Sequence, residues 1–271
     1  MSKQIEITQP ATGYWRATFH NPPINLIDLD TITELSRLVT TLERDSDVKV
    51  IVFDSSDPEF FLAHYDVLSD RARSAAMKEG PTGMRPWLDV LARISRAPVV
   101  SIAALRGRAR GAGSEFALAC DIRFASRESA ILGQFEVAVG AVPGGNPMAR
   151  LPGLMGRGRA LEVVLGADDF PGDLAERYGY VNRAVADADL DAFVDAFARR
   201  IAGFQKAALV EAKRFVDEVS LPDDALFPPA LEQFYRSIAR PETQSRLSQL
   251  LAAGLQTRST VERDLGRHVG D

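Results

Sequence analysis

The chain is poor in the residues that build disulfide frameworks and metal centres. Its 271 residues include a single cysteine, Cys120, and three histidines. A single cysteine excludes a disulfide within the chain, and two of the three histidines have no metal-ligand spacing to any other residue. We therefore expect no disulfide framework and no metal site.

Long apolar runs and an excess of basic residues are also missing. No run of about 18 apolar residues occurs, and the N-terminal MSKQIEITQP lacks the apolar core of a signal peptide. Lys and Arg number 32 against 37 Asp and Glu, a formal net charge of −5. This balance argues against nucleic acid or an anionic membrane as the main partner. We expect a soluble, cytoplasmic protein with no nucleic-acid or membrane partner.

What remains is the composition of an ordinary globular protein. Hydrophobic residues make up 46% of the chain and charged residues 25%, which are typical fractions for such proteins. A chain of this length can bury a sizeable core, either as one large domain or as one domain with an appendage.

The first two thirds of the sequence alternate between strand-like and helix-like patterns. Residues 14–20, YWRATFH, alternate as a half-buried strand does, and the β-branched run at 48–54 is typical of a buried strand. Apolar residues recur at helical spacing from Asp30 to the DSD at 45–47. Further elements are expected as a helix at 86–95 and strands at 99–105, 120–126 and 130–133. Single helices between strands favour an α/β domain with parallel strands.

The pattern changes after about residue 185, where only helices are expected. Apolar stripes at helical spacing mark residues 187–202, 206–218 and 230–255. Exposed stripes of this width usually mark an interface. Nearer the middle of the chain, the polar stretch SDRARSAAMKEGPTG, residues 69–83, is expected to be a mobile loop.

Three residues with little or no side chain, Gly111, Ala112 and Gly113, stand just ahead of Glu115 in the stretch ARGAGSEFALACDIRFAS. Small residues at a strand-to-helix turn leave backbone N–H groups open to a ligand, and the helix N-terminus adds partial positive charge. An oxyanion site needs such donors. The alternative is that the glycines only permit close packing. A dinucleotide site is disfavoured because the GxGxxG fingerprint is not matched.

Five segments in a fixed order resemble those of a known family. They are HNPPINLID from residue 20, FFLAHYDV from 60, RGRARGAGSEFALACDIRFAS from 106, GQFEVAVGAVPGGNP from 133 and LAERYGYVNRAV from 174. Their order and spacing resemble the enoyl-CoA hydratase/isomerase family of the crotonase superfamily over residues 5 to 215. The C-terminal helices match that family only in type.

The resemblance implies an α/β fold in which ββα repeats wind into a spiral over residues 1–200. A C-terminal helical region, 201–271, would serve in trimer formation. Members commonly assemble as homotrimers or as hexamers built from two trimers. They bind an acyl-CoA thioester, so coenzyme A enters as part of the substrate and no separate cofactor is implied. Two backbone N–H groups hold the thioester carbonyl and stabilise an enolate.

By position, the resemblance places the oxyanion donors at the amides of Tyr65 and Ala112, and the catalytic carboxylates at Glu115 and Glu136. Adding water to a 2-enoyl thioester requires deprotonating the water at Cβ and delivering a proton to Cα. Two carboxylates that hold one water between them can do both. An isolated glutamate would instead be a solvated surface residue. Further substrate contacts are implied at Asn25, Leu26, Ala63, His64, Asp66, Gly111 and Gly144.

The oxyanion segment departs from the family pattern. Members usually have glycine where His64 stands, a small residue at Tyr65 and glycine at Ala112. Because only the amides are used, the Tyr65 side chain is tolerable, but it would crowd the acyl pocket. The simplest interpretation of His64 is a partly exposed polar loop residue. The functional alternative is an added base or a hydrogen bond to the substrate.

Basic residues that hold the CoA phosphates in many members are missing as well. Asn21 replaces the arginine of an N-R-P pattern, residues 67–69 contain no lysine, and the C-terminal EGxxAFxEKR pattern is absent. Arg71 and Arg73 are the candidate substitutes. We expect CoA thioesters still to bind, more weakly than usual.

Functions of different classes therefore stay open. The first is a 2-enoyl-CoA hydratase, or an enoyl-CoA isomerase, that uses the glutamate pair. The second is a crotonase-fold hydrolase or decarboxylase of a β-dicarbonyl substrate in which His64 or Tyr65 takes part. The third is a non-catalytic binding or assembly subunit. The glutamate pair favours the first, whereas the altered oxyanion segment and the missing basic residues favour the second.

Overall fold

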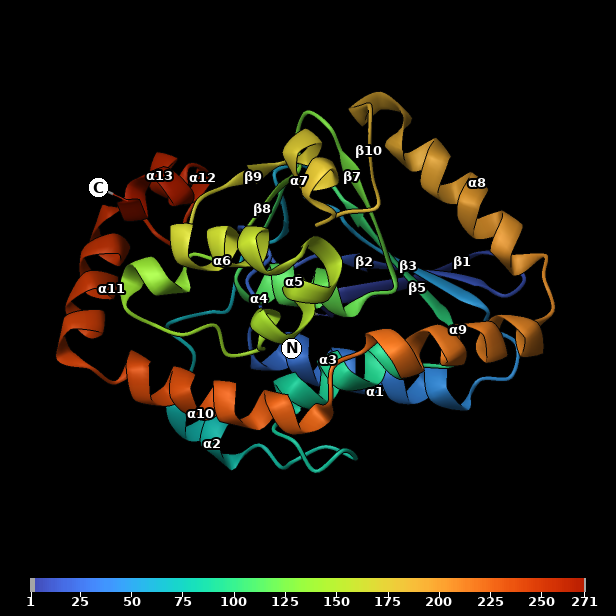
Figure 1. The fold of residues 1–271 in the computed structure, drawn as a ribbon, viewed down its shortest axis with the longest axis horizontal. Coiled ribbons are helices and arrows are strands. Elements are labelled where there is room, and N and C mark those ends of the chain that lie inside the picture. The colour runs from blue at the N-terminus through green and yellow to red at the C-terminus, as the bar shows by residue number, and fades with distance from the viewer. Residues whose placement is uncertain (1–2, 271) are drawn as a thin grey trace.

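The computed structural model describes residues 3–270 and contains two β-sheets (Figure 1). The larger sheet has the strand order β1-β2-β3-β5-β7-β10, and the smaller sheet has the order β4-β6-β8-β9. The larger sheet consists of β1 (Ile5–Ala11), β2 (Tyr14–Phe19), β3 (Val50–Ser55), β5 (Val100–Leu105), β7 (Ile122–Ser126) and β10 (Arg183–Val185). The smaller sheet consists of β4 (Phe60–Leu62), β6 (Arg108–Arg110), β8 (Ile131–Gly133) and β9 (Phe170–Pro171).

Successive strands alternate between the two sheets. Each of β3, β5 and β7 lies in the larger sheet and is followed by a strand of the smaller one, β4, β6 or β8, and then by helical structure. In the larger sheet the pairs β2–β3, β3–β5, β5–β7 and β7–β10 are parallel, whereas β8 and β9 of the smaller sheet are antiparallel. The expected spiral of ββα repeats with parallel strands is therefore confirmed. The antiparallel β1 was not expected; it contains Pro10, which an edge strand tolerates.

Helices account for most of the remaining chain. They are α1 (Leu29–Arg44), α2 (Arg71–Ala76), α3 (Pro86–Arg96), α4 (Ala112–Ala119), α5 (Pro147–Met155), α6 (Arg157–Gly166), α7 (Gly172–Tyr178), α8 (Leu190–Ala202), α9 (Lys206–Ser220), α10 (Phe227–Ile238), α11 (Pro241–Ala253), α12 (Thr260–Arg263) and α13 (Leu265–Gly270). Short 3₁₀ helices are η1 (Glu136–Val139), η2 (Asp187–Asp189) and η3 (Asp224–Leu226).

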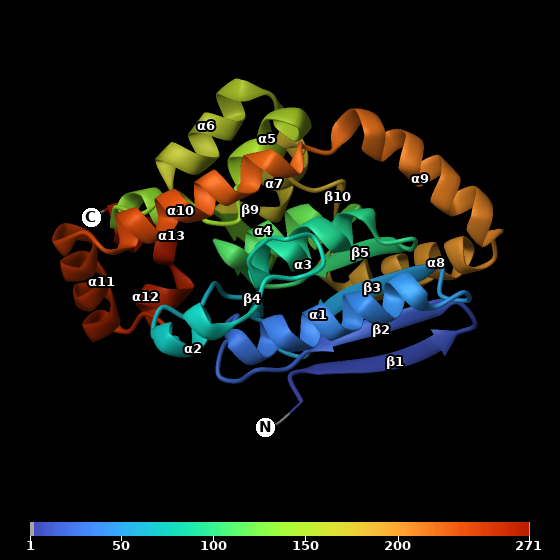
Figure 2. The same cartoon turned by 90° about the horizontal axis from the view of Figure 1, so that it is seen from below.

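The larger sheet is buried on both faces. Ile51 and Phe53 of β3 belong to the core that includes α1 and α3, whereas Val50 and Val52 pack with α8. Figure 2 shows α1 and α3 along one face of this sheet. Burial on both faces explains why β3 is apolar throughout rather than alternating.

The helix expected after Asp30 forms because its start is capped and its apolar stripe is buried. The Asp28 carboxylate accepts hydrogen bonds from the N–H groups of Asp30, at 2.9 Å, and Thr31, at 2.8 Å. These bonds satisfy donors that a helix start otherwise leaves unpaired. α1 then buries Ile32, Leu35, Leu38, Val39 and Leu42.

Two expectations for the helices are corrected. Residues 69–83, expected to be a loop, contain the short helix α2, whose start is capped by the Asp70 carboxylate. The single helix expected over 230–255 is two helices, α10 and α11, because Pro241 lacks the N–H that would continue α10 and instead stands at the first position of α11.

The C-terminal helices α10 to α13 pack around η1 rather than extending away from the core (Figure 1). Leu247 and Leu250 of α11 and Leu265 of α13 form one buried cluster with Phe135 and Val139. This packing brings residues from the end of the chain to the segment that contains Glu136.

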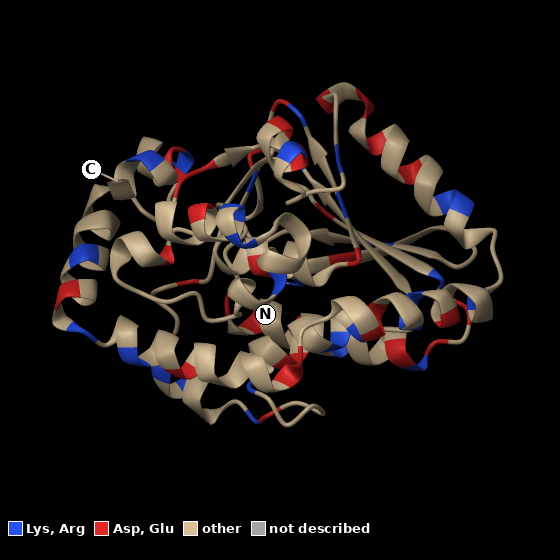
Figure 3. Cartoon of the chain, in the orientation of Figure 1, with Lys and Arg blue, Asp and Glu red and all other residues tan. Residues whose placement is uncertain are grey.

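Charges of both signs occur along the outer helices α8 to α11 (Figure 3). Short ion pairs within one helix, such as Arg199 with Asp195 and Arg214 with Glu218, account for part of this pattern. Among residues 3–270, no helix is both long enough and apolar enough to span a membrane.

Candidate active site

A mainly apolar cavity of about 110 Å³ lies between α3, α4, η1 and the C-terminal helices α10 and α11. Glu115 and Glu136, the two predicted catalytic residues, both line it. So do Tyr65 and Ala112, the residues whose amides were predicted as oxyanion donors. The fold thus brings together four residues from three separate segments: Tyr65 after β4, Ala112 and Glu115 in α4, and Glu136 in η1.

Glu115 is fixed by two hydrogen bonds in the first turn of α4. Trp87 Nε1 donates to Oε2 at 2.9 Å, and the Gly145 N–H donates to Oε1 at 2.8 Å. Phe116, the next residue of α4, packs in the core. Its ring meets the rings of Phe19 and Phe53 edge-on, with ring centroids 5.5 and 5.0 Å apart. Burial raises the pKa of Glu115 above its ordinary value, and the Trp87 and Gly145 hydrogen bonds oppose that rise.

Glu136 has a different environment, although it is also buried. It begins η1, and its Oε2 atom has no hydrogen-bond partner among residues 3–270. Burial, together with the nearby charge of Glu115, raises the pKa of Glu136 to about 8. The environments of the two carboxyl groups therefore differ. Two hydrogen-bond donors favour the ionised form of Glu115, whereas burial and the nearby charge of Glu115 favour the protonated form of Glu136.

The glycines ahead of Glu115 permit close packing, as one of the two interpretations of this turn expects. A Cβ at Gly113 would lie 1.9 Å from the Leu62 carbonyl oxygen, so this glycine lets α4 approach β4 closely. Gly111 has φ +48°, and a Cβ there would lie 2.7 Å from Glu136 Oε1, so this glycine lets the Glu136 carboxyl group approach the turn.

The backbone N–H groups of Tyr65 and Ala112 have no hydrogen-bond partner among residues 3–270. Ala112 is the first residue of α4, where the N–H has no partner within the helix. Tyr65 bridges to Ile27, but the bridge uses the His64 carbonyl and the Asp66 N–H. Within residues 3–270, neither the Tyr65 nor the Ala112 N–H donates a hydrogen bond. Both residues border the cavity that contains the glutamates.

The other predicted contact residues divide into two groups. His64 and Gly144 line the cavity, and a Cβ at Gly144 would lie 3.2 Å from Phe234. Asn25, Leu26, Ala63, Asp66 and Gly111 are not part of its lining, although Gly111 touches Glu136 and Asp66 borders the groove described below.

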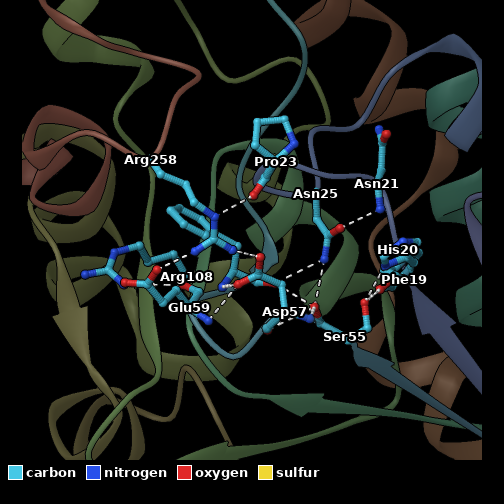
Figure 4. Close-up of polar contacts among 12 residues, drawn as sticks. Phe19, His20, Asn21, Pro23, Asn25, Ser55, Asp57, Glu59, Arg108 and Arg258 are labelled. Carbon is cyan, nitrogen blue, oxygen red and sulfur yellow. Dashed lines mark hydrogen bonds and ion pairs between the residues drawn. The ribbon is translucent and has the colours of Figure 1, made fainter.

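The side chain of Asn25 connects its loop to β3 and β4. Its Nδ2 donates to Ser55 Oγ at 2.7 Å and to the Phe60 carbonyl at 3.2 Å. Figure 4 shows this contact beside a charged cluster in which Arg258 ion-pairs with Asp57 and Glu59. Leu26 and Ala63 pack in the small cluster behind this loop.

His64 is buried, not partly exposed. Its side chain is 1% exposed, and both ring nitrogens have partners: the Tyr65 carbonyl at 2.8 Å from Nδ1 and Glu262 Oε2 at 3.2 Å from Nε2. The expectation of a partly exposed loop side chain is therefore wrong, because α12 covers this residue.

A wider groove of about 610 Å³ adjoins the cavity and shares Tyr65, Val67 and Arg85 with it. Arg71 borders this groove, whereas Arg73 does not border it and is ion-paired with Asp30. Arg85 was not predicted. Its guanidinium donates to the carbonyls of Ser74 at 2.6 Å and Met77 at 3.1 Å. Among residues 3–270 it has no acidic partner.

Sequence reasoning also missed Trp87, Gly145 and Glu262. Trp87 falls in the helix expected at 86–95, where a tryptophan that packs and one that donates to a carboxylate look alike in the sequence. Gly145 acts through its backbone N–H, which leaves no side-chain signal. Glu262 comes from the last helices, where only a general helical pattern was expected.

A family model described as enoyl-CoA hydratase/isomerase matches residues 12–238. The short-chain-enoyl-CoA hydratase of Clostridium acetobutylicum is 30% identical over 72% of this chain and 73% of its own length. The crotonyl-CoA hydratase of Syntrophomonas wolfei is 33% identical over 72% of this chain and 74% of its own length.

A solved structure is more similar still. The crystal structure of a Streptomyces avermitilis protein, provisionally assigned as an enoyl-CoA hydratase, has 44% identity and a TM-score of 0.94. The match covers 99% of this chain and 96% of that one. The chain belongs to the enoyl-CoA hydratase/isomerase family and has the crotonase fold.

Proposed function

We propose that the protein hydrates a 2-enoyl-CoA thioester. The observation that carries the proposal is the pair of buried glutamates with opposite hydrogen-bond environments, facing the same cavity as two free backbone amides. Family membership supports an acyl-CoA substrate. The similar proteins of Clostridium acetobutylicum and Syntrophomonas wolfei are both named hydratases, which supports the reaction class.

The two glutamates take different roles in this reaction. Glu115, whose carboxylate receives two hydrogen bonds, removes a proton from water as the oxygen attacks Cβ of the enoyl group. The electron pair of the C=C bond moves onto the thioester carbonyl, and the amides of Tyr65 and Ala112 stabilise the enolate oxygen. Glu136 then gives its proton to Cα. Water is thereby added across the double bond, and the proton gained by Glu115 balances the one lost by Glu136.

One specific observation favours hydration over a hydrolase or decarboxylase that uses His64. A hydrolase or decarboxylase that uses His64 as a base requires a ring nitrogen able to accept a proton. Both nitrogens of His64 instead face acceptors, so neither is available. Isomerisation shares the enolate intermediate but does not need an attacking water.

Crotonyl-CoA tests the proposal directly. We expect the ultraviolet absorbance of the conjugated enoyl thioester to fall on addition of the protein, with no release of free CoA thiol. Unchanged absorbance with a folded protein would reject hydration. Release of free thiol instead would favour the hydrolase function.

The pKa of Glu136 predicts how the rate depends on pH. Burial and the Glu115 charge raise this pKa to about 8, so the acid form is present below that pH and is lost above it. We expect kcat to fall as pH rises through about 8. A kcat–pH profile for crotonyl-CoA measures this, and a rate that still rises above that pH would contradict the role of Glu136 as an acid.

The groove beside the cavity predicts weak, salt-sensitive CoA binding. Arg71 and Arg85 border it, and exposed charge pairs contribute only about 0–1 kcal/mol each. We expect acetyl-CoA to bind with a dissociation constant of about 10–1000 μM that increases with salt. Calorimetry should show weaker binding for R71A and R85Q. The matched control is R73A, because Arg73 is ion-paired with Asp30 outside the groove. No heat at millimolar acetyl-CoA would reject the thioester substrate.

We further propose a homotrimer, or a hexamer built from two trimers. α9 has no buried residue, and Phe215, Val216 and Val219 are 60%, 61% and 87% exposed. Such a stripe on one helix is typical of a subunit interface. Sedimentation velocity at micromolar protein should give the trimer or hexamer, and V219E should dissociate it. A monomeric wild-type protein would contradict the proposal.

A further inference from the structure

The segment that carries the Tyr65 amide is tied to the C-terminal end of the chain. His64 Nε2 lies 3.2 Å from Glu262 Oε2, although 198 residues separate them. The two side chains are 1% and 0% exposed. α12, which contains Glu262, is itself fixed to β6, because Arg110 Nη1 donates to the Glu262 carbonyl at 2.9 Å. The contact is therefore a buried tertiary link rather than a surface ion pair.

The ring of His64 connects Glu262 to the backbone of Tyr65. Its Nδ1 lies 2.8 Å from the Tyr65 carbonyl oxygen, and its Nε2 faces the Glu262 carboxylate. Both partners are acceptors, so both nitrogens donate and the ring is a cation. Burial disfavours that charge, yet Glu262 and the Tyr65 carbonyl raise the pKa of His64 above its ordinary value. Because the positive charge of the imidazolium and the negative charge of the carboxylate cancel, the pair adds no net charge beside Tyr65. It therefore acts by fixing the position of the Tyr65 backbone.

The same C-terminal segment also holds the residue on the other side of Tyr65. The Gln256 N–H donates to Glu262 Oε2 at 2.8 Å, and Gln256 Nε2 donates to Asp66 Oδ1 at 2.7 Å. His64 and Asp66, the two neighbours of Tyr65 in the chain, are thus both bound by residues 256–262.

We propose that Glu262, acting through His64, is a positioning residue that holds the backbone of Tyr65 in place, so that the Tyr65 N–H meets the developing oxyanion. An oxyanion donor is effective only if it is in place before the charge forms. The kinetic part of this inference rests on the proposed function, whereas the link between α12 and the Tyr65 segment does not.

A purely structural role for α12 predicts a different result, and a neighbouring residue separates the two. Arg263 anchors the same helix to the start of β4 through Glu59, with Nε 2.9 Å from Oε1. Within the described part of the chain, its side chain forms no hydrogen bond or ion pair with His64 or Tyr65. R263A therefore weakens the attachment of α12 without touching the Glu262–His64 pair, which makes it the matched control.

The experiment compares steady-state kinetics of E262A, E262Q and R263A with crotonyl-CoA. We expect E262A to lower kcat about 10- to 100-fold with KM changed by less than about threefold, because the lost interaction acts mainly in the transition state. E262Q should recover most of kcat, since an amide can still bond a neutral His64 ring. R263A should stay within about twofold of wild type.

A double variant tests whether His64 and Glu262 act together. The kcat of H64A/E262A should be no lower than that of the slower of the single variants H64A and E262A, because the two residues act as one unit.

A second measurement does not depend on turnover. Hydrogen exchange of residues 60–67 should become faster in E262A and not in R263A. If wild type does not hydrate crotonyl-CoA, this measurement still decides whether Glu262 orders the Tyr65 segment. If E262A does not fold, E262D carries the same test, because it keeps the charge but withdraws it from Nε2. Wild-type kcat and wild-type exchange in a folded Glu262 variant would overturn the inference and leave the proposed hydration intact. Equal losses in E262A and R263A would also overturn it.

Discussion

E136Q should lower kcat for crotonyl-CoA hydration by about 10²–10⁴-fold, the usual contribution of a positioned acid or base. E115Q should have an effect of the same size. Glutamine keeps the shape of each side chain but can neither remove a proton from water nor deliver one to Cα. KM should change little in both variants, because the carboxyl groups act on the reacting atoms and not on the CoA moiety.

The control for these variants is E162Q, because Glu162 is an exposed residue of α6 that bonds only the Tyr178 hydroxyl. Its kcat should match wild type. Wild-type kcat in either E115Q or E136Q would remove that residue from the mechanism. Thermal unfolding of all three variants shows whether a lost rate reflects lost structure.

G113A should cause the second large effect. A Cβ at this position would lie 1.9 Å from the Leu62 carbonyl oxygen, so the start of α4 must move away from β4. The Ala112 amide moves with the helix, and the distance between the two oxyanion donors changes. Loss of one such donor costs about 10²–10³-fold in kcat. Crowding of a packed backbone also lowers the free energy of unfolding by about 1–3 kcal/mol.

G158A is the matched control for this substitution. Gly158 lies in α6, and nothing would lie within 4 Å of an added Cβ. Because alanine favours helix over glycine by about 1 kcal/mol, G158A should be neutral or stabilising, with wild-type kcat. A G113A protein that keeps both wild-type kcat and wild-type urea midpoint would contradict the account of this turn.

Local patterns predicted the parts of the fold that local forces determine. The stripe of α1 and the apolar run of β3 could be recognised because each element buries its own pattern. The break between α10 and α11 was missed even though Pro241 marks it, because the apolar periodicity continues across the proline. The two glutamates were predicted from the resemblance to the family, not from spacing.

The environment of those glutamates was not predictable in the same way. Whether Glu115 receives a hydrogen bond depends on Trp87, a residue of α3 that approaches only after the helices pack. The burial of His64 depends on Glu262, which is nearly two hundred residues away. Contacts between distant segments leave no periodic trace in either segment, so a single sequence gives no basis for pairing them.

The most direct test of the central claim is the reaction of crotonyl-CoA in water labelled with a heavy oxygen isotope, followed by mass spectrometry of the products. Hydration by the glutamate pair predicts a 3-hydroxyacyl-CoA that carries one labelled oxygen at C3, formed by wild type and almost absent with E115Q or E136Q. Label found instead in a free carboxylic acid, or an unchanged substrate with folded wild-type protein, would contradict it.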